Sequence, residues 1–453
     1  MKKIRTILLV TLTFSLKAQY QDSVTIRKIY DFYLTESKCY KNLDVLCNTI
    51  GARLSGSPQA EKSIEWAKQA MYDAGADTVY LQPCMVTHWE RGTKESAVLT
   101  YPGKRIVLNV CALGGSTATP VSGINAGVVE VKSFEELEKL GEKNIKGKIV
   151  FYNVFFNPKN ITTGQSYGET VKYRHIGAVK ASKFGAVATV VRSMSSINND
   201  SPHTGSLTYD SALVKIPSFA LSFKAANDLA EALKSDPKLL LSLKSFCKIL
   251  PDAPSFNVIG EIRGSEKPNE YIIAGGHLDS WDLGQGAHDD GAGVVQCIDA
   301  LAMFKKLKIK PKHSIRAIAF MNEENGLGGG KAYARETEKK KWKHIAAIET
   351  DAGGFTPRGF NVDTLGGMYK AAVSWKPLLA PYFIHSIKPG GGGADIGPLE
   401  KFNVPCIGFE PDGQRYFDIH HTADDTFDKI HKRELELGAA AIGSLVYLID
   451  KYK

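Results

Sequence analysis

Short apolar runs alternate with a long helical pattern in the C-terminal half of the chain, and this order constrains the fold more than any other feature. Residues 271–274 and 314–321 are strand-like, residues 291–307 repeat apolar side chains at helical spacing, and residues 344–349 form a further strand-like run. A strand-helix-strand order predicts an α/β fold with a mixed, largely parallel sheet sandwiched by helices. Ligands of such sheets bind beyond the carboxyl ends of the strands, so polar residues there are the first candidates for a site.

Potential metal ligands follow several of these runs or lie in turns. They are two histidines and three acids, with a further acid beside them: His277, Asp289, Glu324, Asp351 and His421, with Glu323 before Glu324. Two imidazoles and three carboxylates are the donors that a pair of zinc ions requires when the ions share one carboxylate. The additional acid could serve as the general base of a metal-assisted hydrolase. Each residue alone also has an ordinary explanation, such as an N-cap for Asp289 or a solvated acidic turn for the glutamates.

Three further features lie near these residues. Asp279 follows His277 by two residues and is placed to accept the second ring N–H of that histidine. We expect His288 to lie outside the ligand set, because Asp289 sits better at the Gly-rich turn. The tract of glycines at 390–393 before Asp395 is either a flexible substrate loop or a plain surface turn.

The pattern of the sequence changes to short strand-like runs and turns between about residues 116 and 250. Short strand-like runs at 127–131, 148–153, 186–192 and 216–220 are separated by Gly, Pro, Asn and Ser, and one helix is expected at 173–184, before Gly185. This predicts an inserted, mostly β module at 116–250. The remaining chain divides into an N-terminal part at 19–115, with helices in 24–75 and strands at 77–82 and 96–101, and a catalytic part at 251–453.

The N-terminus has the pattern of a secretory signal. Residues 1–18 begin with Lys2, Lys3 and Arg5, continue with an apolar run at 6–16 and end at Ala18. The apolar run is too short to span a bilayer, and no integral membrane segment is expected after its removal. We therefore expect an exported protein, periplasmic or extracellular. The formal net charge of +9 includes four basic residues of this segment, so the remaining mild excess predicts no nucleic-acid partner.

The seven cysteines are odd in number and contain no CxxC pair. This argues against a cysteine zinc site and against a dense disulfide framework. A single bridge between Cys39 and Cys47 is conceivable in an exported protein, and buried free thiols are the alternative.

Several motifs resemble those of the co-catalytic zinc exopeptidases, the family that includes bacterial leucyl aminopeptidases and glutamate carboxypeptidase. The strongest is Gly276-His277-Leu278-Asp279-Ser280-Trp281-Asp282, followed by Gly284-Gln285-Gly286-Ala287 and Asp289-Asp290-Gly291. These runs are most similar to the carboxypeptidase Q group. Ser201-Pro202-His203-Thr204-Gly205 and Lys215-Ile216-Pro217 also resemble the protease-associated insert of that group. The resemblance implies the zinc-exopeptidase fold with such an insert.

The resemblance also implies roles for the candidate residues. Asp289 would bridge two Zn²⁺ ions per chain, with His277 and Asp351 on one ion and Glu324 and His421 on the other. Glu323 would be the general base and Asp279 the partner of His277. The run at 322–329 is closer to the broader family than to the carboxypeptidase Q group. The resemblance therefore defines the type of reaction more closely than the preferred substrate.

Three functions remain compatible with these motifs. The first is an exopeptidase acting as a homodimer on dipeptides or short peptides with a free N-terminus. The second is an aminopeptidase on longer peptides, and the third is a non-catalytic, receptor-like binding protein of the same fold. The complete ligand set together with Glu323 favours hydrolysis.

Overall fold

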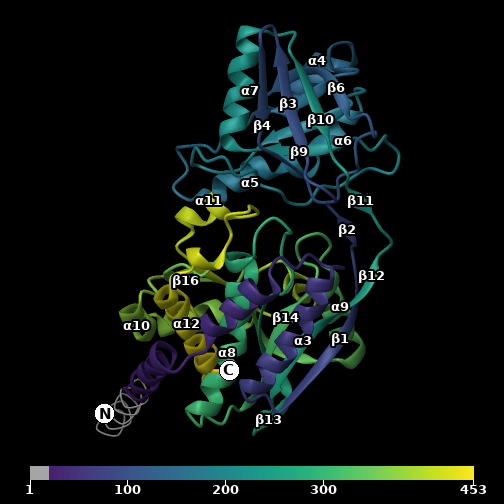
Figure 1. Ribbon diagram of the computed structural model, residues 1–453. Helices are drawn as coiled ribbons and strands as arrows, with labels where there is room; N and C mark the ends of the chain where they lie inside the picture. The colour runs from purple at the N-terminus through teal and green to yellow at the C-terminus, as the bar shows by residue number, and fades with distance from the viewer. Residues whose placement is uncertain (1–19) are drawn as a thin grey trace, which may run out of the picture.

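Two eight-stranded sheets organise residues 20–453, which are the residues described by the computed structural model (Figure 1). The predicted signal segment lies outside the described residues. The first sheet has the strand order β1 (Thr78–Val86), β12 (Ala253–Ile262), β14 (His313–Phe320), β13 (Lys267–His277), β15 (Lys343–Glu349), β18 (Cys406–Pro411), β16 (Pro357–Val362) and β17 (Ser386–Pro389). Its four central strands, β14, β13, β15 and β18, are parallel, while β12 and β16 run antiparallel to their inner neighbours. The predicted mixed α/β sheet is confirmed.

Helices cover both faces of this sheet. One face is covered by residues 20–35, α2 (Cys39–Asp44), η1 (Val45–Ile50), α3 (Pro58–Asp73), α8 (Ala292–Lys306), α10 (Met368–Leu379) and α12 (Lys432–Tyr452). The other face is covered by α9 (Gly328–Lys340) and η5 (Gly397–Phe402). All eight residues of β14 are buried, as a central strand between two helical layers requires. The start of α3 is fixed by the Ser57 side chain, which accepts the Ala60 N–H, and by Pro58 in the first turn.

The second sheet belongs to a separate module, seen at the top of Figure 1. Its order is β4 (Lys104–Leu108), β3 (Ser96–Tyr101), β10 (Leu240–Lys244), β6 (Ile124–Val131), β7 (Ile149–Tyr152), β8 (Ala188–Arg192), β9 (Ser218–Leu221) and β5 (Val110–Ala112). Strands β6 to β9 are parallel neighbours. The module also contains α4 (Phe134–Ile145), α5 (Thr163–His175), α6 (Gly177–Ser182) and α7 (Phe223–Ser235).

This module differs from the predicted one in three respects. Its helices and strands contribute similar numbers of residues, so it is an α/β module and not mostly β, because parallel strands need crossover connections. Strands β3, β4 and β5 precede residue 116, so the second sheet begins earlier than the boundary predicted there. The helix predicted at 173–184 is interrupted at Ile176, between α5 and α6.

The chain crosses between the two sheets through a narrow ribbon in which β2 (Trp89–Glu90) pairs with β11 (Lys248–Ile249). Beside this ribbon, Trp281 from the first sheet's side packs into the core of the module. A Cβ atom on Gly114 would lie 1.8 Å from the Trp281 ring, so only glycine permits this contact. Arg91 binds both carboxylate oxygens of Asp282, at 2.7 and 2.6 Å. The junction between the two sheets is therefore held by apolar packing of Trp281 and by the ion pair between Arg91 and Asp282.

All seven cysteines are buried and free. The conceivable Cys39–Cys47 bridge does not form, and the Cys39 thiol donates instead to the Val295 carbonyl at 3.4 Å. No helix within residues 20–453 has the length and apolar character needed to cross a bilayer.

Candidate metal centre

The candidate ligands gather at the carboxyl edge of the central parallel strands. His277 is the last residue of β13 and pairs with Phe320, the last residue of β14. Glu323 and Glu324 follow β14 by a few residues, and Asp351 follows β15 by two. Because parallel strands end at the same edge, these residues meet although they are far apart in sequence.

Asp289 lies at the centre of the group and faces one histidine with each of its oxygens. Nε2 of His277 is 3.2 Å from Oδ1 of Asp289, and Nε2 of His421 is 3.2 Å from Oδ2. Asp351 lies 3.5 Å from the same nitrogen of His277, and Glu324 lies 3.2 Å from the same nitrogen of His421. The five predicted residues thus form two half-sites that share one carboxylate.

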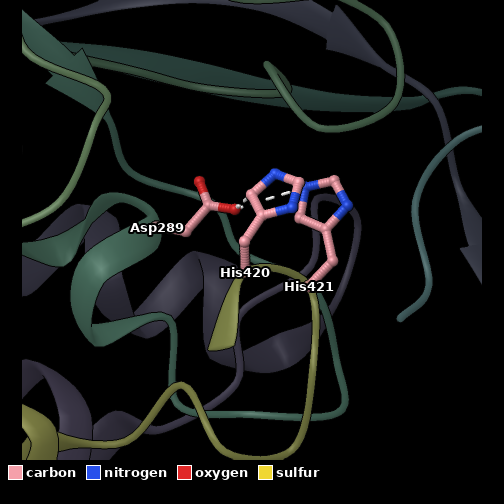
Figure 2. A group of neighbouring side chains, drawn as sticks. All are labelled: Asp289, His420 and His421. Atoms are coloured by element: carbon pink, nitrogen blue, oxygen red, sulfur yellow. Dashed lines mark ion pairs between the residues drawn. The ribbon is translucent and has the colours of Figure 1, made fainter. Parts of the chain in front are cut away.

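His420 is a sixth donor beside this group. Its ring stacks on that of His421 with centroids 3.5 Å apart, and its Nε2 lies 3.6 Å from Oδ2 of Asp289 (Figure 2). Asp289, His420 and His421 are close enough to hold one metal ion together. His420 was not among the predicted ligands, although it directly precedes His421 in the sequence.

The loop that carries Asp289 is held by polar groups that sequence reasoning missed. The Asp425 carboxylate accepts the N–H groups of His288 and Asp289, at 2.8 and 3.1 Å. The fully buried Arg53 side chain donates to the carbonyls of Leu278 and Gly286. Neither residue has a local sequence signal, because each acts on a segment distant in sequence.

His288 is turned away from the other donors. Its Nδ1 accepts the Gly354 N–H at 3.0 Å, its Nε2 lies 3.3 Å from the Lys429 carbonyl, and its ring stacks on Phe355. Both ring nitrogens are therefore engaged in the protein.

Asp279 holds the segment that carries the two glutamates. Its Oδ1 accepts the N–H groups of Asn322 and Glu323, at 2.7 and 3.1 Å. The predicted contact of this carboxylate with His277 is absent at hydrogen-bond distance, since Oδ1 lies 3.9 Å from Nδ1. The backbone carbonyl of Asp279 takes that place at 3.0 Å. Glu324 is held by the Trp281 N–H at 3.2 Å, whereas Glu323 is half-buried and lines the cleft.

The charges of the group fit divalent cations. Burial and the nearby Asp289 carboxylate raise the pKa of Glu324 to about 7. Burial, Asp351 and Glu324 raise the pKa of Glu323 well above its usual range, although His277 opposes this. Burial lowers the pKa of His421, but Glu324 and Asp289 raise it more, to about 10. Crowded carboxyl groups have raised pKa values when no nearby positive charge stabilises their ionised forms. Bound metal ions supply that positive charge.

The metal-free protein is expected to lose stability as pH rises. Glu324 and Glu349, with pKa values of about 7 and 8 in the fold against an ordinary 4.5, and His421, with a pKa of about 10 against 6.5, all bind protons more tightly when folded. Their contribution to the free energy of unfolding is complete at low pH and disappears as pH rises from about 4.5 to about 10.

Zinc would replace protons at Glu324 and His421, so the stabilising effect of zinc should grow over this pH window. Thermal unfolding of chelator-treated protein at pH 5, 7 and 9, with and without zinc, measures this; a zinc effect independent of pH would contradict it.

A cleft of about 630 Å³ opens beside these residues. Its floor includes Asp289, Glu323 and Asp351, and its opposite wall comes from the second module, through Tyr167 and Arg174 of α5 among others. The helix α11 (Tyr416–Ile419) lies beside α5 (Figure 1). Phe417 of α11 stacks on Tyr167 of α5 with ring centroids 4.6 Å apart. None of the glycines at 390–393 lines this cleft, and the tract instead passes over Glu349, whose Oε1 would lie 1.8 Å from a Cβ on Gly393.

Comparison with known proteins gives consistent results. The sequence profile of peptidase family M28 matches residues 257–446. Carboxypeptidase Q of Bos taurus is 35% identical over 418 residues, covering 91% of this chain and 85% of the bovine protein, and carboxypeptidase Q of Xenopus laevis is 38% identical over 392 residues, covering 86% and 81%. The crystal structure of a peptidase M28 precursor from Shewanella amazonensis SB2B has a TM-score of 0.91 at 32% identity, covering 95% of this chain and 97% of that one. A zinc aminopeptidase from Bacillus subtilis shares the fold, with a TM-score of 0.64 at 22% identity over 90% and 94% of the two chains.

Proposed function

The chain belongs to peptidase family M28 as a carboxypeptidase Q-like, zinc-dependent exopeptidase, and on this basis we propose that it is an exported di-zinc enzyme that hydrolyses dipeptides or other short peptides with a free N-terminus. One observation carries the di-zinc proposal. The two oxygens of Asp289 face different histidines, His277 and His421, at the same distance of 3.2 Å. A carboxylate in this position can serve two ions at once.

We assign the ligands from the two half-sites. His277 and Asp351 would complete one zinc site, Glu324 and His421 would complete the other, and Asp289 would belong to both. His420 lies farther from Asp289 than His421 does and stacks on it, which suits a supporting ring more than a ligand. The export of the chain rests on the pattern of residues 1–18, and a homodimer is proposed from the resemblance alone.

The reaction would be carried by Glu323 beside the zinc ions. Bound zinc polarises a scissile carbonyl and lowers the pKa of water. Glu323 would take a proton from the attacking water and deliver it to the leaving amine. Two features support this role: Glu323 lines the cleft, and the Asp279 carboxylate fixes its backbone N–H. Asp279 thus positions the base through the backbone. A non-catalytic, receptor-like role does not suit a chain that retains all these residues.

The wall of the cleft supports a preference for short substrates. Arg174 is buried and makes no ion pair with a carboxylate of residues 20–453, and its nearest polar partner is the Tyr167 hydroxyl at 2.8 Å. Nη1 lies farther from its neighbours, 3.5 Å from the Thr204 carbonyl and 3.4 Å from Nδ1 of His421, and Nε has no hydrogen-bond partner among residues 20–453. The guanidinium, with its five N–H donors, therefore retains capacity for an anionic group. The C-terminal carboxylate of a dipeptide would supply such a group. Against this, a neighbouring cavity of about 560 Å³ shares Asp351, Tyr416 and Phe417 with the cleft and offers room for longer peptides. The aminopeptidase alternative therefore stays open.

Four related substrates separate these readings. We expect a dipeptide to be hydrolysed faster than its N-acetyl form, its C-terminal amide and its tripeptide extension. Each change removes or displaces a charged terminus, and a charge-assisted contact is worth about 1.5–3 kcal/mol. Measuring kcat/KM for all four with the zinc-loaded protein tests this. Equal rates on dipeptide and tripeptide would favour the aminopeptidase, and rapid cleavage of the acetylated form would refute both exopeptidase readings.

A further inference from the structure

We propose that the second module is a working part of the metal centre: its 203–205 loop, made of His203, Thr204 and Gly205, orients His421 and thereby sets the zinc affinity of the half-site formed by His421 and Glu324. This inference rests on the proposed di-zinc function. It assigns to the module a positioning role that is separate from its contribution to the cleft wall.

Two hydrogen bonds join the loop to His421. The Thr204 N–H donates to the His421 carbonyl at 2.9 Å, and the Thr204 carbonyl lies 3.2 Å from Nδ1 of His421. Since Nε2 of His421 faces Asp289 and Glu324, we assign the proton to Nδ1, which then donates to the Thr204 carbonyl. Nη1 of Arg174 approaches the same carbonyl, at 3.5 Å, and lies 3.4 Å from Nδ1 of His421. The loop thus fixes both the backbone of this residue and the direction of its ring.

The backbone of His421 needs such support. Its φ of 62° lies in the left-handed region, which residues other than glycine adopt at a cost of about 1–3 kcal/mol. Such a conformation persists when surrounding contacts determine it. The hydrogen bond from the Thr204 N–H to the His421 carbonyl is one such contact.

The loop is itself anchored in the module. The Thr204 hydroxyl donates to the Ala112 carbonyl at 3.0 Å and receives an N–H of Arg91 at 3.3 Å. The His203 N–H donates to the Ser193 hydroxyl at 2.8 Å. The position of His421 is therefore tied to β5 of the second sheet and to the segment that directly follows β8.

In the half-site of His277 and Asp351, the histidine ring is not oriented by the second module. Nδ1 of His277 lies 3.0 Å from the carbonyl of Asp279, two residues later in the same strand-end segment. Its orientation is set within the first sheet's part of the chain. Disturbing the 203–205 loop should therefore weaken one half-site and spare the other.

Gly205 offers a way to disturb the loop. Its φ is 128°, and a Cβ there would lie 2.5 Å from Cζ and Nη1 of Arg174. Gly205→Ala must displace either the loop or the guanidinium. Gly147→Ala is the matched control, because Gly147 lies in the same module with a φ of 75° but has nothing within 4 Å of an added Cβ. Thr204→Val, which removes only the hydroxyl contacts of the loop, is a milder second variant.

The test is a zinc titration of the full-length, chelator-stripped protein, followed by calorimetry and by the absorption spectrum of bound Co²⁺. The wild type and Gly147→Ala are expected to bind two ions with the same two affinities. Gly205→Ala is expected to lose about 10- to 100-fold in affinity at one site, as loss of a ligand-orienting contact typically does, and Thr204→Val less. In a Glu324→Gln background, which disables the His421 half-site, Gly205→Ala should leave the remaining site unchanged.

The outcomes are distinguishable. Wild-type affinities at both sites in Gly205→Ala and Thr204→Val would overturn the positioning role, as would an equal loss at both sites. If Gly205→Ala does not fold, Thr204→Val decides by the same criterion. A wild type that binds only one ion would instead refute the di-zinc proposal on which the inference rests.

Discussion

Glu323→Gln is expected to lower kcat by at least about 10²–10⁴-fold, the usual contribution of a general base. Glutamine has nearly the same shape as glutamate but cannot accept the proton of the attacking water. The backbone at this position is held by the Asp279 carboxylate through the Glu323 and Asn322 N–H groups, so the substitution should not move the segment. The metal content and the unfolding temperature should stay close to those of the wild type.

The measurement is steady-state hydrolysis of a dipeptide together with elemental analysis of the same preparation. Glu324→Gln is the informative comparison, because this neighbouring residue contacts His421 at 3.2 Å and is a proposed ligand. That variant should lose metal as well as activity. Near-normal turnover by Glu323→Gln would move the base to another residue.

Asp289→Ala is expected to abolish both metal binding and activity, because this carboxylate is shared by the two half-sites. Removing the metals from the wild type with a chelator should have the same effect on activity, and zinc should restore the wild type but not the variant. Bound zinc also stabilises the fold, by about 2.7 kcal/mol at a free concentration 100-fold above the Kd. The unfolding temperature of the wild type should therefore fall on chelation, whereas that of Asp289→Ala should not respond to zinc.

Elemental analysis and thermal unfolding with and without zinc measure this second effect. His288→Gln is the matched control, since His288 precedes Asp289 in the chain but its ring nitrogens face Gly354 and Lys429. It should retain both metals. An active wild type with a single tightly bound metal, or two metals in Asp289→Ala, would refute the bridging role.

The contributions of the second module were beyond the reach of the sequence. Thr204 and His421 are 217 residues apart, and their contact depends on how the two sheets pack across the junction at Trp281 and Arg91. The mixed character of the module was also missed, because its short strands between Gly, Pro and Asn turns favoured a mostly β prediction. The helix α7 buries Ala225, Leu229 and Ala232 at helical spacing, a pattern that the prediction did not use. Arg174 gave no signal as a lining residue, because the cleft forms only where the module meets the first sheet's part of the chain.

The role of Asp279 shows a second limit of sequence reasoning. Its spacing from His277 predicted a contact between the carboxylate and the ring, but the carboxylate turns toward the N–H groups after β14. Two residues can be placed on the same strand end from sequence, but the direction of each side chain depends on which partners the neighbouring strand presents.

The sequence by itself determined the parallel centre of the first sheet and the set of residues at its carboxyl edge. It could do so because buried strands leave continuous apolar runs, and because polar residues such as His277 and Asp351 stand out where those runs end. Only the tertiary structure decided how His277 and His421 divide the two oxygens of Asp289, and which part of the chain holds each ring in place. These depend on contacts between distant segments, and no local pattern of side chains encodes them.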